Sequence, residues 1–305
     1  MKKKILITGS NGLLGQKLAD LLVHNPEVEL IATSRGANKL AAVYPELTFE
    51  PMDVTSEEEV MQVVEKHKPT HLIHTAAMTN VDQCETDREN CWKQNVEAVA
   101  NLIAACEAHD VHLIHVSTDF IFSGENGPYT ENAVPGPVNF YGESKLAAEE
   151  LVMEAECKWS IARTVLVYGI VHDYGRSNIV LWVKENLQAG KNIKVVDDQL
   201  RSPTLAEDLA QGCWLIARHD AQGVFNISGK ELLTPYEMAL RVADYFALDK
   251  SYIDKADAST FTQTAKRPPR TGFIITKAEN ELGYKPHSFT EGIALMEEQL
   301  KEMKA

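Results

Sequence analysis

Tyr141 and Lys145 stand four residues apart in the run Tyr-Gly-Glu-Ser-Lys. On a helix, this spacing places the two side chains on the same face. A tyrosine with its ordinary pKa of about 10 is a poor acid–base group at neutral pH. A cation beside it stabilises the phenolate and brings that pKa toward the working range. The pair therefore indicates a tyrosine that exchanges a proton with a bound substrate, although most Tyr-x-x-x-Lys pairs taken alone are surface residues.

Two hydroxyl residues, Ser117 and Thr118, follow the apolar run 111–116. If this run is a strand of a parallel sheet, both hydroxyls emerge at its carboxyl end, where such folds bind ligands. A hydroxyl there can hydrogen-bond a substrate carbonyl oxygen next to Tyr141. By themselves the two residues are also typical of a plain turn at a strand end. Together with Tyr141 and Lys145 they favour a catalytic centre.

A glycine-rich loop, residues 8–15, lies between the first apolar run and the first amphipathic stretch. Gly9 permits a tight turn, Gly12 lets the backbone approach a pyrophosphate, and Gly15 lets a helix pack closely on a strand. The helix that follows offers free amides and a partial positive charge to phosphates. This position favours dinucleotide binding over an ordinary glycine-rich turn. The expected cofactor contacts in the loop are Gly9, Asn11, Gly12, Leu13, Leu14 and Gly15.

The end of the second expected strand bears on the choice between NAD and NADP. An acidic residue there would hydrogen-bond the 2′-hydroxyl of NAD, but the sequence has Ser34 and Arg35, with Lys39 one helical turn further. Arg35 can hold a 2′-phosphate through a charge-assisted hydrogen bond. NADP(H) is therefore favoured, while NAD(H) and a merely solvated Arg35 stay open. Asp53 and Val54 follow the third expected strand and are placed to meet the adenine, although Asp53 equally suits a helix cap.

These residues need a framework that alternates strands and helices. Strands are expected at 4–8, 29–33, 47–52, 71–75, 111–116 and 159–165, and helices at 13–24, 56–67, about 87–108 and 141–156. This alternation predicts an α/β fold with a doubly wound parallel sheet of the Rossmann type. The pattern becomes irregular after about Tyr168. We therefore expect a Rossmann domain over residues 1–168 and a smaller C-terminal substrate-binding lobe over 169–305, with segments interleaved with the sheet.

Length, charge and cysteine content argue against several classes of protein. The 305 residues carry 30 Lys and Arg against 44 Asp and Glu, a net charge of −14, unlike a generally basic nucleic-acid binder. The five cysteines include no Cys-x-x-Cys pair, which argues against a disulfide framework or a structural zinc site. No stretch approaches the roughly 20 apolar residues of a membrane span. We expect a cytoplasmic protein without nucleic-acid or membrane partners.

The histidines include two pairs spaced by three residues, His71 with His74 and His112 with His115. Each pair falls in one expected strand. Residues three apart on a strand point to opposite faces. The spacing therefore predicts no metal site.

The glycine loop, the Ser117-Thr118 pair and Tyr141-x-x-x-Lys145 resemble the extended short-chain dehydrogenase/reductases. Finer matches resemble one branch of that family, the dTDP-4-dehydrorhamnose reductases. These matches are the Ser-Thr-Asp-Phe-Ile-Phe run at 117–122, the Ala-Ala-Met-Thr-Asn-Val-Asp-Gln-Cys-Glu run at 76–85, Asp-Gln at 198–199, Pro-Thr at 203–204, Asp-Leu-Ala at 208–210 and Arg-Pro at 267–268. The resemblance covers nearly the whole chain.

The resemblance implies NADPH-dependent reduction of a 4-keto sugar nucleotide. Tyr141 would protonate the carbonyl oxygen, Lys145 would bind the nicotinamide ribose and tune Tyr141, and Thr118 would hydrogen-bond the substrate oxygen. The remaining cofactor contacts would be Ser117, Ala76 and Ala77, with Asn95 behind the site. The substrate contacts would be Thr79, Val81, Asp119, Asn178, Arg201 and Arg267. A homodimer stays open.

Two other functions also stay open. An epimerase or dehydratase would use the same scaffold. Dehydratases of the superfamily tend to carry Asp-Glu after the threonine, where this chain has Asp119-Phe120. Epimerases keep NAD bound, and Arg35 argues against NAD. The other alternative is a non-catalytic NADP-binding regulatory subunit, like that of methionine adenosyltransferase, whereas an intact Thr118, Tyr141 and Lys145 favour an enzyme. Leu166 replaces a Trp usual in the branch, which bears on the sugar more than on the reaction.

Overall fold

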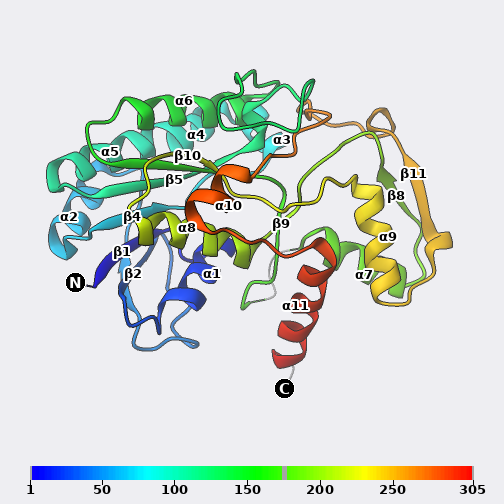
Figure 1. The fold of residues 1–305 in the computed structure, drawn as a ribbon, viewed down its shortest axis with the longest axis horizontal. Helices are drawn as coiled ribbons and strands as arrows, with labels where there is room; N and C mark the ends of the chain where they lie inside the picture. Colours follow the sequence, from blue (N-terminus) through cyan, green and yellow to red (C-terminus); the bar gives the residue numbers. More distant parts are fainter. Residues whose placement is uncertain (1, 174–176, 304–305) are drawn as a thin grey trace.

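The computed structural model describes residues 2–173 and 177–303. Its centre is a seven-stranded sheet in the order β10-β6-β5-β4-β1-β2-β3, with every neighbouring pair parallel (Figure 1). The strands are β1 (Lys3–Thr8), β2 (Val28–Ser34), β3 (Thr48–Pro51), β4 (His71–His74), β5 (His112–Thr118), β6 (Trp159–Thr164) and β10 (Gly223–Asn226). The doubly wound Rossmann sheet expected from the sequence is confirmed.

Helices cover both faces of the sheet, because successive strand residues point to opposite sides. Ile5 and Ile7 pack on one face and Leu6 on the other. The first face carries α1 (Leu13–Leu22), α8 (Ala206–His219) and α10 (Thr276–Leu282). The second face carries α2 (Glu57–His67), α5 (Ala98–His109) and α6 (Phe140–Glu154) (Figure 1). The strands are buried on both faces, which explains their largely apolar sequences.

The helix expected at about 87–108 is interrupted. The chain forms α3 (Val81–Thr86), α4 (Arg88–Trp92) and then a π-helical turn over Lys93–Glu97, before α5 begins. The apolar pattern is continuous through this stretch, and so it did not reveal the wider turn. Such π turns often occur at functional sites, and this one carries Asn95.

A second apolar core lies beside the sheet domain, at the right of Figure 1. It is built from α7 (Ile179–Gln188), β8 (Ile193–Val196), α9 (Pro235–Tyr245), β11 (Ile253–Ala256) and α11 (Phe289–Glu302), and β8 pairs with β11. Two short strands, β7 (Val167–Tyr168) and β9 (Thr204–Leu205), pair with each other. The later elements α8, β10 and α10 return to the central sheet. Within the described residues, no helix has the length and apolar character that crossing a membrane requires.

Candidate active site

A cavity of about 580 Å³ opens at the carboxyl ends of the central strands. It gathers side chains from segments far apart in the sequence, as expected where ligands bind in this class of fold. Of the predicted site residues, those that line it are Gly9, Gly12, Leu13, Leu14, Ser34, Arg35, Asp53, Val54, Ala76, Ala77, Thr79, Val81, Ser117, Thr118, Asp119, Tyr141 and Lys145. Those that line it without having been predicted include Gln94, Leu166 and Val167.

The glycine loop is shaped by close backbone contacts. Gly9 has φ of +69°, and a side chain there would meet the backbone of Ala76 at 2.9 Å. A Cβ on Gly15 would come within 2.4 Å of the carbonyl oxygen of Gly9, so only glycine lets α1 start this close to the loop. No side chain caps α1 at Gly12. The first amides of α1 therefore remain available for an anion.

At the other end of the cavity, Asn11 holds the loop that follows β2. Its amide group donates to Ser34 Oγ (3.0 Å) and the Ala37 carbonyl (2.9 Å), and its side-chain oxygen accepts from the Lys39 amide (3.0 Å). Arg35 is exposed at the cavity rim, whereas the Lys39 ammonium is paired with Asp173 at 2.6 Å. Asn11 thus supports the rim through its side chain rather than facing the cavity.

Asp53 lies in the cavity wall, but it does not cap the helix that follows. Its carboxylate lines the cavity and accepts hydrogen bonds from the Thr55 amide (3.0 Å) and hydroxyl (2.9 Å). Burial would raise its pKa, but these bonds and the charge of Arg35 lower it. The N-cap of α2 is Ser56, and Asp53 instead stabilises the turn before the helix.

Tyr141 is buried in the cavity wall, beside Thr118 and Asp119. The Thr118 hydroxyl donates to Asp119 Oδ1 (3.1 Å) and accepts from the Phe120 amide (3.2 Å), which fixes its direction. Burial raises the pKa of Tyr141 above its usual value, although a hydrogen bond with Thr118 lowers it. The expected lowering of this pKa is therefore not seen, because burial outweighs the other influences. A tyrosine in this state keeps its proton, as an acid must.

Lys145 makes contacts that the sequence did not suggest. The residue is 3% exposed, and its ammonium donates to His115 Nε2 (3.0 Å) and to the Val116 carbonyl (2.9 Å). Burial lowers the pKa of Lys145 to about 8 and holds the pKa of His115 well below its ordinary value. His115 is therefore a neutral acceptor that positions Lys145. Only the pairing of β5 with α6 in space reveals it, since 30 residues separate the two.

Asn95 lies behind the cavity rather than in its wall. Its side chain accepts from the Met78 amide (2.8 Å) and donates to the Met78 carbonyl (3.1 Å) and to Ser144 Oγ (3.0 Å). Met78 follows β4, and Ser144 lies on α6 next to Lys145. The π turn thus lets one amide tie the loop after β4 to the helix that carries the Tyr-Lys pair.

Three predicted substrate residues lie outside the large cavity, with their polar groups already bound by the protein. Arg201 is 4% exposed and donates to Gln199 and to the carbonyls of Leu200, Pro268 and Pro269. Arg267 forms a two-pronged ion pair with Asp82, with both N–O distances 2.7 Å. This pair lowers the pKa of Asp82 to about 2. These arrangements favour a positioning role for both arginines.

Asn178 caps α7, accepting from the amides of Val180 (3.0 Å) and Leu181 (3.2 Å). It also lines a second cavity of about 380 Å³ in the C-terminal lobe. That cavity has two aromatic side chains and one lysine in its wall. Its lining is Ser177, Asn178, Ile179, Trp182, Lys194, Val195, Val196, Pro235, Phe261 and Gln263.

Comparisons with known proteins show which family the chain resembles along its whole length. The family described as RmlD substrate binding domain matches residues 2–302. The dTDP-4-dehydrorhamnose reductase of Aggregatibacter actinomycetemcomitans is 29% identical over 95% of this chain and 97% of the relative. Methionine adenosyltransferase 2 subunit beta of Danio rerio is 31% identical over 91% of this chain and 84% of the relative. A solved dTDP-4-dehydrorhamnose reductase of Bacillus anthracis, in complex with NADP, has a TM-score of 0.83 and 28% identity, covering 98% of this chain and 100% of that one.

Proposed function

Because this chain belongs to the RmlD substrate binding domain family, within the extended short-chain dehydrogenase/reductases, we propose that it is an oxidoreductase that uses NADPH to reduce the 4-keto group of a sugar nucleotide. One observation carries the proposal. A single cavity brings the glycine loop and Arg35 together with Thr118, Tyr141 and Lys145. Relatives named as reductases of dTDP-4-keto sugars support the substrate class.

The residues present fit a dinucleotide. The uncapped start of α1 suits a pyrophosphate, Arg35 suits a 2′-phosphate, and Lys145 is placed to hydrogen-bond a ribose hydroxyl. When bound, NADPH supplies the hydride for the carbonyl carbon. The protein supplies the proton and the orientation.

Tyr141 is the proton donor in this proposal. The Thr118 hydroxyl lies beside the phenol, and its hydrogen would turn from Asp119 Oδ1 to the carbonyl oxygen when the substrate binds. As negative charge develops on that oxygen, the proton moves from Tyr141 Oη to it, and the product is an alcohol. Burial keeps Tyr141 protonated until then, and the Lys145 ammonium stabilises the phenolate that remains.

We further propose that the second cavity holds the nucleotide portion of the substrate. Trp182 and Phe261 offer ring faces to a base, and Lys194 offers a cation to phosphate. The substrate would thus meet both cores of the molecule, its sugar at Tyr141 and its base in the C-terminal lobe.

Loss of NADPH absorbance with dTDP-4-dehydrorhamnose as substrate tests the proposal. We expect wild-type turnover and a decrease in kcat of about 10²–10⁴-fold in Tyr141→Phe, since general acid catalysis contributes about that much. The NADPH dissociation constant should not change. Tyr44→Phe is the control, because the Tyr44 hydroxyl bonds Asp20 outside the cavity. Undiminished turnover in Tyr141→Phe would refute Tyr141 as the acid.

A non-catalytic NADPH-binding subunit is the second candidate, favoured by the similarity to methionine adenosyltransferase 2 subunit beta. The same assay separates the two. Tight NADPH binding with no turnover of any 4-keto sugar nucleotide would favour the subunit.

A further inference from the structure

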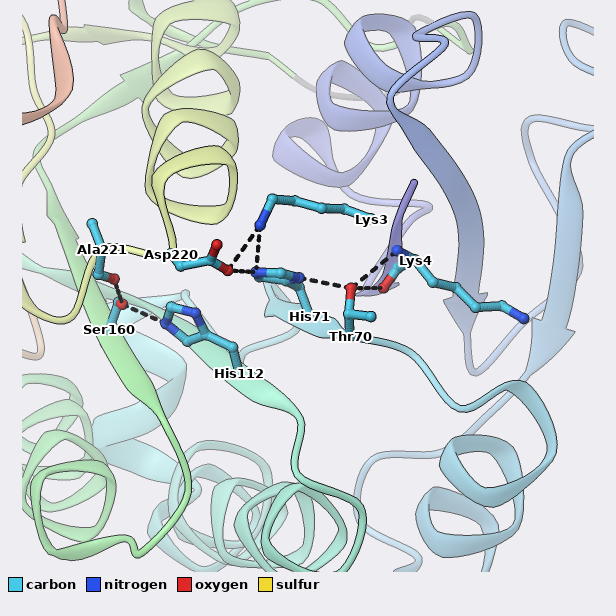
Figure 2. Close-up of polar contacts among 8 residues, drawn as sticks. All are labelled: Lys3, Lys4, Thr70, His71, His112, Ser160, Asp220 and Ala221. Atoms are coloured by element: carbon cyan, nitrogen blue, oxygen red, sulfur yellow. Dashed lines mark hydrogen bonds and ion pairs between the residues drawn. The ribbon is translucent and has the colours of Figure 1, made fainter. Parts of the chain in front are cut away.

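A cluster of two histidines and one aspartate lies at the amino ends of the central strands, opposite the active-site cavity. His71 begins β4 and His112 begins β5, and the strand register pairs them, with ring centroids 5.3 Å apart. Asp220 ends α8 and brings its carboxylate within 2.9 Å of His71 Nε2 (Figure 2). Each residue offers one ligand atom, and the three atoms lie within 4.8 Å of one another.

The protonation pattern of His112 is fixed by its neighbours. The Ser160 hydroxyl donates its hydrogen to the Ala221 carbonyl, so Ser160 Oγ accepts from His112 Nε2 at 2.8 Å (Figure 2). His112 Nδ1 therefore carries a lone pair. That nitrogen is buried and has no hydrogen-bond partner among the described residues. In Figure 2 it faces the side on which Asp220 and His71 lie.

His71 also lies in a chain of hydrogen bonds, with Thr70 on one side and Asp220 on the other. The Thr70 hydroxyl lies 3.1 Å from the Lys4 carbonyl and 2.8 Å from His71 Nδ1, and it can donate its hydrogen to either. His71 Nε2 lies 2.9 Å from Asp220 Oδ1, and in the tautomer that carries its hydrogen there the ring donates to that carboxylate. With the ring hydrogen on Nδ1 instead, Thr70 Oγ would accept it, and Nε2 would present a lone pair to a cation beside Asp220.

Lys3 is that cation in the structure. Its ammonium lies 2.8 Å from Asp220 Oδ1 and 3.5 Å from His71 Nε2. The Lys3 side chain is 21% exposed and that of Asp220 is 60% exposed, so both can move toward solvent and an ion can enter.

We propose that His71 Nε2, His112 Nδ1 and the Asp220 carboxylate bind a divalent ion of the zinc class, which takes the place of the Lys3 ammonium. Two neutral imidazoles and one carboxylate, with water as the fourth ligand, are a known set for such ions. Ligand distances of about 2.0–2.2 Å require these atoms to approach within about 3.5 Å of each other. The hydrogen bonds that the other ring nitrogens donate to Thr70 and Ser160 would orient the rings as metal-ligating histidines require.

The ion would be structural rather than catalytic. It would join the end of α8 to two central strands, and none of its ligands lines the active-site cavity. The spacing of His71 and His74 excludes them as a chelating pair. The parallel register of β4 and β5 instead places His112 beside His71. Asp220, 149 residues after His71, reaches the same place through the fold of the chain.

Zinc titration of the chelator-treated full chain by calorimetry, with anomalous diffraction at the zinc edge, tests the site. We expect one ion at the cluster and a higher Tm in its presence. Asp220→Asn should weaken binding by at least tenfold, and Ser160→Ala by about 10–100-fold. Lys3→Met should tighten binding by about tenfold, since it removes the competing charge.

Asp110→Asn is the matched control. Asp110 also ends a helix with a left-handed backbone, φ 52° against 50° for Asp220, and asparagine tolerates that conformation. It should bind zinc as the wild type does. No uptake, uptake that Asp220→Asn leaves unchanged, or a zinc peak only at the cysteines would overturn the site. Unchanged affinity in Lys3→Met would overturn the exchange with Lys3.

Discussion

Arg35 is the side chain on which cofactor choice should depend. It lies on the cavity rim after β2, where the acidic residue typical of NAD-binding proteins is missing. We expect Arg35→Ala to weaken NADPH binding by roughly tenfold or more, because a charge-assisted hydrogen bond contributes about 1.5–3 kcal/mol. NADH binding should change little. Fluorescence titration of both cofactors measures the effect.

Lys39→Ala is the control for this prediction. Lys39 has the same charge and lies on the same loop, but its ammonium is paired with Asp173. It should retain most NADPH affinity. If Arg35→Ala lost equal affinity for NADPH and for NADH, Arg35 would support the loop and would not bind the 2′-phosphate.

Lys145 should make stability depend on pH. Its pKa in the folded protein is about 8, below the ordinary 10.5, because burial disfavours the charged form. Between these values the unfolded chain holds a proton that the folded chain has released, so stability rises with pH in this window. We expect the stability of wild type relative to Lys145→Met to increase by roughly 3 kcal/mol from neutral pH to about pH 10.5.

Urea unfolding across this pH range measures the difference. The exposed Lys191→Met serves as the comparison and should follow the wild-type curve. If the difference in unfolding free energy between wild type and Lys145→Met did not change with pH, the ammonium would be well solvated in the folded state.

Helices and strands could be predicted where a local sequence pattern determines where they begin and end. The order of strands and helices through β6 follows from apolar runs and from Ser56 and the glycine loop, which mark helix starts. The π turn at Lys93–Glu97 could not be predicted, since it serves contacts of Asn95 with Met78 and Ser144 that exist only in the folded chain. In the same way, motif spacing identified Tyr141 and Lys145, but His115 required the packing of α6 on β5.

Helix α6 depends on a buried ion pair. Glu149, fully buried and one turn after Lys145, accepts from Arg163 Nε (3.0 Å) and from the Arg163 guanidinium end (2.6 Å). Arg163 lies on β6 and also donates to the Glu131 carbonyl (2.9 Å). We expect Glu149→Gln to lower the free energy of unfolding by about 3–5 kcal/mol, because it leaves the buried guanidinium without its counter-charge.

The exposed pair of Lys66 with Glu50 is the comparison. Lys66→Ala should cost less than about 1 kcal/mol, as surface ion pairs contribute little. Both changes are measured by denaturant unfolding. If the two variants lost similar stability, the pair between α6 and β6 would be no stronger than a surface contact.

At the scale of the whole molecule, the two apolar cores carry different proposed binding sites, one for the cofactor and one for the nucleotide of the substrate. The sheet domain supplies the large cavity with its glycine loop and Tyr141, and the C-terminal core supplies the second cavity around Trp182. Segments that return to the sheet, such as α8 and β10, join the two parts. Because the two cavities have no lining residue in common, cofactor binding and nucleotide binding should be separable by mutation.

Trp182→Ala tests this division. If a nucleotide base packs on the indole ring, its loss should raise KM for the sugar nucleotide by roughly tenfold or more, since stacking of a base on an aromatic ring contributes about 1–3 kcal/mol. The dissociation constant of NADPH should stay at the wild-type value, because Trp182 does not line the large cavity proposed to bind the cofactor. Trp182→Phe keeps a ring face and should recover most of the affinity. An unchanged KM in Trp182→Ala would place the base elsewhere, whereas a parallel loss of NADPH affinity would show that the two cavities act as one.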